Sequence, residues 1–126
     1  MLELKDFEEA KKRVDEVIIP TPLIYSPAFS KECRNMVYIK PENLQRTGAF
    51  KIRGAYNKIM KMDDESKSRG LIASSAGNHA QGVAYAAQQL GVKATIVMPA
   101  HTPLIKVDAT KALGAEVVLH GEVYDD

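Results

Sequence analysis

Between residues 71 and 119, short apolar segments alternate with segments of helical pattern, and this alternation limits the possible folds more than any other feature. We expect strands over residues 71–73, 94–98 and 116–119, separated by helices over 78–90 and 104–113. Each helix is followed by a glycine, which suits a helix C-terminus. Short apolar strands joined by helices are typical of a parallel sheet with helices on both faces and right-handed crossovers. The predicted fold class is therefore α/β, with a doubly wound parallel sheet.

The residues before 71 predict a helix and a pair of strands. Asp6, with Glu9 three residues later, is typical of a helix N-cap with its capping-box partner, and apolar residues then recur at helical spacing as far as Ile18. The elements expected after this helix are strands over 23–25 and 36–40, helices over 28–33 and 50–62, and a solvated turn over 63–70. The two strands are close in sequence, so they are able to pair. At the end of the sequence we expect a loop over 121–126 that leads towards a further helix.

Composition and charge exclude several classes of partner. The chain has 126 residues, enough for one modest domain, and a formal net charge of +1, which gives no basis for a nucleic-acid or anionic-membrane partner. Cys33 is the only cysteine, which excludes an internal disulfide and a multi-cysteine metal site and suits a reducing cytosol. Neither a signal peptide nor an apolar run of membrane-spanning length is visible. We therefore expect a cytoplasmic location, without nucleic-acid or membrane partners.

One lysine stands in an unusual place. Lys51 follows a polar loop and lies at the predicted start of a helix, where the helix dipole disfavours an ammonium ion and favours the neutral amine. A neutral amine is the form that reacts with an aldehyde to give a Schiff base. Thr47 and Gly48 allow a tight loop before the lysine, and Phe50 offers a flat apolar face beside its amine. Without further support, a solvent-facing helix lysine is the simpler interpretation.

A second segment favours an anion site. Residues 74–82 follow the predicted strand over 71–73 and precede a helix. A small polar turn at a helix N-terminus presents unpaired N–H groups and hydroxyls, which suit a carboxylate or another anion. The alternative is that these residues only cap the helix.

The remaining charged residues suggest structural roles. Arg46 and Arg53 flank the lysine, and we expect both to form exposed salt bridges. His101 and His120 have no partner at a metal-ligand spacing, so no metal site is predicted.

Four blocks of the sequence, in matching order and spacing, resemble the threonine dehydratase branch of the pyridoxal-phosphate (PLP) enzymes with the tryptophan-synthase β-type fold, fold type II. The blocks are KPENLQ at 40–45, TGAFKIRGA at 47–55, SAGNHAQG at 75–82 and TKALGAEV at 110–117. The similarity extends from about Thr21 to the last residue. It implies that residues 1–45 belong to a large domain and residues 46–126 to a small α/β domain. Because members of that family are longer, we expect this chain to be an N-terminal piece of such an enzyme.

The resemblance also implies roles for individual residues. Lys51 would hold PLP and act as the base, Phe50 would lie against the pyridine ring, and Asn78 would hydrogen-bond the phenolic oxygen of the ring. The pocket for the substrate carboxylate would be formed by Ser75, Ala76, Gly77, Asn78 and His79. Without the resemblance, core packing for Phe50 and helix capping for the turn are the simpler interpretations, and His79 is expected to be structural or to contribute only its N–H.

The implied activity is deamination of L-threonine, and of L-serine, by β-elimination to 2-oxobutanoate or pyruvate and ammonia, as in isoleucine biosynthesis. Racemising relatives tend to have a serine at the place of Ala76, and an alanine has no proton to give, which favours elimination. Serine racemase and threonine synthase remain alternatives. A non-catalytic α/β module is a further alternative, because the glycine-rich phosphate loop of the family is not found in the sequence. The expected partners are an amino-acid substrate and further copies of the enzyme, as a dimer or tetramer.

Overall fold

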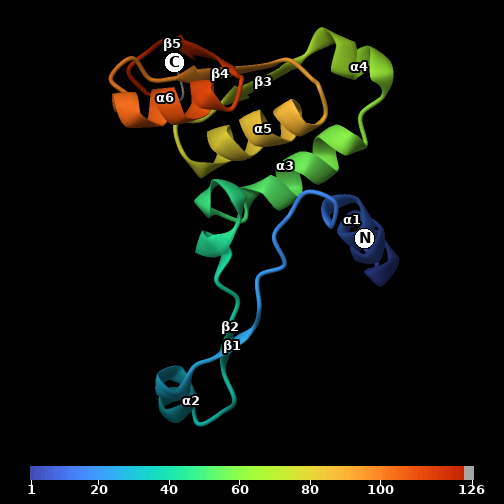
Figure 1. Cartoon of the computed structure of the whole chain (residues 1–126), viewed down its shortest axis with the longest axis vertical. Helices are drawn as coiled ribbons and strands as arrows, with labels where there is room; N and C mark the ends of the chain where they lie inside the picture. Colours follow the sequence, from blue (N-terminus) through green and yellow to red (C-terminus); the bar gives the residue numbers. More distant parts are fainter. Residues whose placement is uncertain (124–126) are drawn as a thin grey trace.

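The computed structural model describes residues 1–123 and shows an α/β body from which a two-stranded arm extends (Figure 1). The sheet of the body has three parallel strands in the order β3 (Leu71–Ser74), β4 (Ala94–Met98) and β5 (Glu116–Leu119). Ile96 at the centre of β4 lies beside Ala73 on one side and Val117 on the other. The predicted α/β class and parallel pairing are confirmed, and β3 is one residue longer than predicted.

Both connecting helices, α5 (Asn78–Gln89) and α6 (Leu104–Ala112), lie on one face of the sheet (Figure 1). On this face Ile96 and Met98 are buried. On the opposite face Ile72 is 81% exposed. The sequence predicts helices on both faces, but within residues 1–123 they cover one. Strands that follow one another in a sheet, joined by crossovers of one hand, place their helices on the same side.

Helix α3 (Lys51–Met60) packs along α5 and also contacts α1 (Leu4–Val14). Its buried residues recur at helical spacing and are Ile52, Ala55, Tyr56 and Ile59. They belong to one hydrophobic core with buried residues of α5 and β4. The core therefore joins the lysine-bearing helix to the sheet, and it holds the start of α3 in place.

The first helix starts earlier and ends earlier than predicted. Its N-cap is Glu3 rather than Asp6, and the Asp6 carboxylate accepts a hydrogen bond from Glu3 N at 2.8 Å. Asp6 is thus the third residue of the helix, where an acidic side chain interacts well with the unpaired N–H groups. The helix ends at Val14 rather than near Ile18, although Val17 is still buried.

The segment over 63–70 is not a turn, as the sequence suggested, but contains helix α4 (Asp64–Arg69). The Asp63 carboxylate accepts a hydrogen bond from Ser66 N at 2.7 Å and caps this helix. Because every side chain of α4 is polar, the helix has no apolar stripe by which its pattern could be recognised.

The arm, residues 20–41, extends away from the body (Figure 1). β1 (Ile24–Tyr25) pairs antiparallel with β2 (Tyr38–Ile39), as predicted, and α2 (Pro27–Cys33) connects them at the tip. The exposed apolar side chains of the arm include Leu23, Phe29 and Met36. Among the described residues, the hydrophobic core contains none from the arm. The arm is therefore held by its own backbone pairing and by a polar junction with the body.

The predicted loop after Gly121 begins within the described part of the chain, but residues 124–126 lie outside it. Across residues 1–123, no helix combines the length and the apolar character needed to cross a membrane. The same residues contain no group of three or more His, Cys, Asp or Glu side chains that could hold a metal ion.

Candidate functional site

Lys51 is the first residue of α3 and lies at the surface. Its Nζ atom is 4.9 Å from the centre of the Phe50 ring. Phe50 is 57% exposed, so its ring is not packed in the core, which was the simpler interpretation of the sequence. An amine at a helix N-terminus beside an exposed aromatic face is therefore present, and both groups are accessible to a ligand.

The loop before the lysine contains two consecutive residues in the left-handed region, Thr47 at φ 63° and Gly48 at φ 68°. Glycine adopts this conformation without strain, whereas a β-branched residue does so at a cost. Among the described side chains, the Thr47 hydroxyl is also buried without a hydrogen-bond partner. The loop thus keeps an unfavourable conformation, which requires the surrounding structure to hold it.

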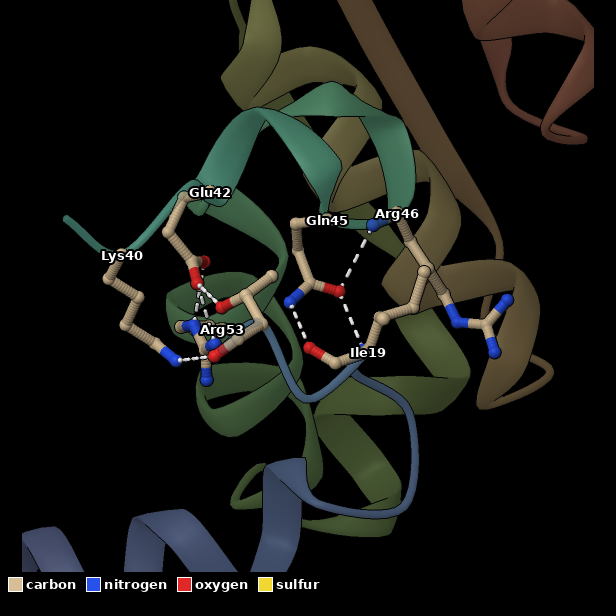
Figure 2. Close-up of polar contacts among 7 residues, drawn as sticks. Ile19, Lys40, Glu42, Gln45, Arg46 and Arg53 are labelled. Atoms are coloured by element: carbon tan, nitrogen blue, oxygen red, sulfur yellow. Dashed lines mark hydrogen bonds and ion pairs between the residues drawn. The ribbon is translucent and has the colours of Figure 1, made fainter. Parts of the chain in front are cut away.

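Gln45 ties this loop to the residues that follow α1 (Figure 2). Its amide nitrogen donates to Ile19 O at 2.8 Å, and its amide oxygen accepts from Ile19 N at 2.8 Å and from Arg46 N at 3.0 Å. The side chain is buried, with 4% of the residue exposed. A buried amide whose partners are all backbone groups acts as a fixed cross-link between two chain segments.

Glu42 links the arm to α3 (Figure 2). Its carboxylate accepts two hydrogen bonds of 2.8 Å from the Arg53 guanidinium and one of 2.7 Å from the Thr21 hydroxyl. Lys40 Nζ donates to Thr21 O at 2.6 Å. The hydrogen bonds from Arg53 are the main cause that lowers the pKa of Glu42 from 4.5 to about 2, and those to Glu42 raise the pKa of Arg53. The pair stays ionised at neutral pH and fixes the chain two residues after Lys51.

The expectation of exposed salt bridges for both flanking arginines is corrected by this geometry. The ion pair of Arg53 is partly buried, with 29% of its side chain exposed against 18% for Glu42. Arg46 instead donates from Nε to Val17 O at 2.8 Å, and its guanidinium lies 5.9 Å from the centre of the Tyr85 ring. Both arginines therefore hold the loop before the lysine.

The turn between β3 and α5 uses part of its donors for folding. Ser75 N donates to Val97 O at 3.0 Å, so this N–H is not available to a substrate carboxylate, contrary to prediction. Among the described residues, the Ser75 hydroxyl accepts a long hydrogen bond of 3.4 Å from Gly77 N. The side chain of Ala76 is buried in the core. Helix α5 begins at Asn78 without a side-chain cap, which leaves its first turn suited to an anion.

The start of α3 and the middle of α5 lie in close contact. A Cβ atom placed on Gly82 would be 3.0 Å from the Cβ of Lys51. Asn78 precedes Gly82 by four residues, so the two share one face of α5. The contact therefore places Lys51 beside the face of α5 that also carries Asn78.

His79 lies apart from this arrangement. It is exposed and lines a groove of about 350 Å³ between α3 and β3, together with Ile59 and Ile72. The walls of this groove are mostly apolar and include no carboxylate that would orient the imidazole. His79 therefore contributes to a groove that Lys51 does not line, in keeping with a structural side chain.

Sequence reasoning did not identify Glu42, Gln45 or Gly82 as parts of the site. The partner of Gln45 is 26 residues away, so no local pattern reveals it. Gly82 was identifiable from the sequence, because a glycine inside a helical pattern usually has a packing or functional reason.

Residues 14–126 match the family model described as "Pyridoxal-phosphate dependent enzyme". The chain belongs to this family. The PLP dependence that the four blocks implied is therefore confirmed at the level of the family.

Two curated relatives are named for the activity that the blocks suggested. The L-threonine ammonia-lyase of Thermotoga maritima is 51% identical over 100% of this chain and 31% of the relative. The "L-threonine dehydratase catabolic TdcB" of Staphylococcus aureus is 50% identical over 100% of this chain and 37% of the relative. This chain thus spans about a third of the length of these relatives.

Solved structures of PLP enzymes superpose on nearly the whole chain. Serine racemase from Dictyostelium discoideum gives a TM-score of 0.91 at 37% identity, over 98% of this chain and 40% of that one. Threonine deaminase isoform 2 from Solanum lycopersicum gives 0.85 at 42% identity, over 98% of this chain and 36% of that one. The fold type II assignment is confirmed by these similarities.

The residues present fit the aldehyde and the ring of PLP. An aldehyde requires a primary amine, and a planar ring requires an apolar face beside it. Lys51 and Phe50 provide both, with the amine and the ring 4.9 Å apart. A phosphate group requires several N–H donors, and the glycine-rich loop that supplies them in the family is not in this sequence.

Proposed function

We propose that these residues form the lysine-bearing part of a threonine ammonia-lyase. The reaction is the deamination of L-threonine to 2-oxobutanoate and of L-serine to pyruvate, with release of ammonia. The observation that carries the proposal is the position of Lys51, at the start of α3, beside the Phe50 ring and against α5. The names of the relatives from Thermotoga maritima and Staphylococcus aureus support the choice of reaction.

In this proposal the amine of Lys51 would hold the cofactor until the substrate amine replaces it, and the freed amine would then move the proton at the substrate Cα. PLP, when bound, supplies the electron sink for that step. Phe50 holds one face of the cofactor ring, and Asn78 binds its phenolic oxygen. The substrate carboxylate is held at the 75–79 turn, by the Ser75 hydroxyl and the N–H groups of the first turn of α5. The phosphate is held by a glycine-rich loop outside these residues.

Elimination is favoured over racemisation because of Ala76. Its methyl group is buried in the core, and it provides no acidic proton for the second face of Cα. The second candidate is serine racemase, which the similarity to the Dictyostelium discoideum structure favours. Product analysis with L-serine separates the two, because elimination gives pyruvate and racemisation gives D-serine.

We further propose that residues 1–45 belong to a large domain and residues 46–126 to a small one. The support is the arm, whose apolar side chains are exposed in this chain and suit burial against further residues. A homodimer or homotetramer and a cytoplasmic location stay predictions for the enzyme.

The test is a PLP titration of the 126-residue chain, followed by borohydride reduction and peptide mapping of the pyridoxyl label. We expect the label on Lys51, its loss in Lys51→Arg, and no change in the matched variant Lys58→Arg, which alters an exposed lysine of the same helix. Label scattered over surface lysines in the unaltered chain would contradict the proposal.

A further inference from the structure

Gly82 stands inside α5, where the backbone does not require a glycine. The helix runs from Asn78 to Gln89, and Gly82 is not among the glycines with positive φ. Glycine is the weakest helix former apart from proline. Its presence in the middle of the helix therefore needs a reason in the packing.

The reason is the approach of the lysine. A Cβ atom on Gly82 would lie 3.0 Å from Lys51 Cβ, 3.1 Å from Lys51 C and 3.2 Å from Ile52 N. Two of these three atoms are backbone atoms, which cannot rotate away as the end of a side chain can. Ile52 is fully buried, so the start of α3 is fixed in the core and has little room to move.

We propose that Gly82 is a positioning residue for Lys51. By lacking a side chain, it lets the first turn of α3 lie directly on α5, and it sets how far the lysine amine stands from the 75–79 turn. A methyl group at position 82 separates the two helices at this point and displaces the amine. The proposal rests on the proposed function, because Gly82 would maintain the distance between the Lys51 amine and the substrate site. A displacement of about 1 Å in an active site is enough to lower the reaction rate strongly.

Gly54 provides the matched control. It is also a helical glycine, in α3, but a Cβ atom placed on it meets nothing within 4 Å. Gly54→Ala therefore adds the same methyl group near the lysine without creating a steric clash.

The first experiment measures covalent labelling of the 126-residue chain by PLP, with borohydride reduction and peptide mapping. The ratio of label on Lys51 to label on the exposed Lys58 is compared in the unaltered chain, Gly82→Ala and Gly54→Ala. We expect Gly82→Ala to lower this ratio by about tenfold, because the amine leaves its site, and Gly54→Ala to leave it unchanged. Where the unaltered chain does carry the label on Lys51, an equal ratio in all three proteins would overturn the proposal.

The second experiment needs no cofactor and separates the positioning role from the proposed function. Lysines are ¹³C-dimethylated, and the Lys51 resonance, which lies near the Phe50 ring, is followed by NMR. We expect it to shift in Gly82→Ala and not in Gly54→Ala. If the unaltered chain takes no PLP on Lys51 but this shift occurs, the proposed function fails and the positioning role stands. If the Lys51 resonance does not shift in Gly82→Ala, the positioning role is overturned, whatever the result of the labelling experiment.

Loss of folding in Gly82→Ala, judged by circular dichroism, is also decisive. The variant is then combined with Lys51→Gly, which removes the nearest atom and frees the backbone of residue 51. Restored helix content supports the contact as the cause, and its absence overturns the proposal.

Discussion

Two loops lie next to Lys51, and they use their polar groups in opposite ways. In the junction over 40–50, Gln45 makes three hydrogen bonds and Glu42 another three, all to groups of this chain. In the turn over 75–79, the Ser75 hydroxyl accepts one long hydrogen bond, and the helix that follows has no side-chain cap. The first loop also holds Thr47 in a left-handed conformation.

The difference indicates a division of tasks. Side chains that hydrogen-bond to internal partners hold a segment rigidly, whereas donors left at a helix N-terminus are available to a ligand. The junction thus fixes where the lysine stands, and the turn is the part suited to bind. Changes in the junction should therefore affect stability much more than changes in the turn.

The largest effect is expected from Gln45→Leu. The substitution keeps the size of the side chain but leaves Ile19 N, Ile19 O and Arg46 N without their buried partner, at a cost of about 2–4 kcal/mol in the free energy of unfolding. Urea denaturation measures it. Gln89→Leu, at an exposed position of α5, is the control and should change stability by less than about 0.5 kcal/mol. A similar loss of stability in both variants would show that the buried hydrogen bonds of Gln45 do not stabilise the junction.

A smaller effect is expected from Glu42→Gln. The neutral amide cannot replace the bidentate carboxylate, and the partly buried Arg53 loses its counter-charge, at a cost of about 1.5–3 kcal/mol. The control is Glu65→Gln, because the Glu65–Arg69 pair is exposed and such pairs contribute less than about 1 kcal/mol. Guanidinium denaturation of both variants gives the comparison, and an equal cost would contradict the buried pairing.

The same carboxylate should make stability depend on pH. The pKa of Glu42 is lowered from 4.5 to about 2 in the folded chain, so the unfolded chain binds a proton first as the pH falls. The contribution of the Glu42 carboxylate to the free energy of unfolding is complete above pH 4.5 and is lost between that pH and about pH 2. Urea midpoints measured across this range should fall more steeply for the unaltered chain than for Glu42→Gln. Parallel curves would show that Glu42 is not the group responsible.

The smallest effect is expected from Ser75→Ala. The hydroxyl contributes one hydrogen bond of 3.4 Å, and its loss should change the free energy of unfolding by less than about 0.5 kcal/mol. Thermal denaturation in low-salt buffer is sufficient to measure it. A loss as large as that of Gln45→Leu would mean that the turn, like the junction, is built mainly for stability.

The fold was predictable where the pattern is local. The strands over 94–98 and 116–119 match the predicted bounds, because short apolar runs, the first of them ended by Pro99, identify them without tertiary information. The position of Lys51 at the start of a helix was predicted and is confirmed, whereas its role in the site stays a prediction. Helix α4 was missed because its sequence is polar throughout, and its only signal is the cap at Asp63.

The contacts that hold the lysine loop were not predictable. Gln45 reaches Ile19 and Arg46 reaches Val17 across more than 25 residues, and no periodicity connects such pairs. The hydrogen bond from Ser75 N to Val97 O of β4 was also not predicted, because it depends on the register of two strands. Residue types indicated the chemistry of the site, whereas tertiary contacts decide which of its donors are available.

Strand order in the sheet follows chain order, which suits folding during synthesis. β4 pairs with β3 and β5 pairs with β4, so each of these two strands leaves the ribosome after a strand with which it pairs. Helix α3 emerges before all three strands, yet the surface on which it rests is α5. Of α1 and α5, which α3 contacts, α1 is translated before it and α5 after it, so the packing of α3 is complete only once α5 has been translated. Lys51 reaches its final position only after Gly82 has left the exit tunnel.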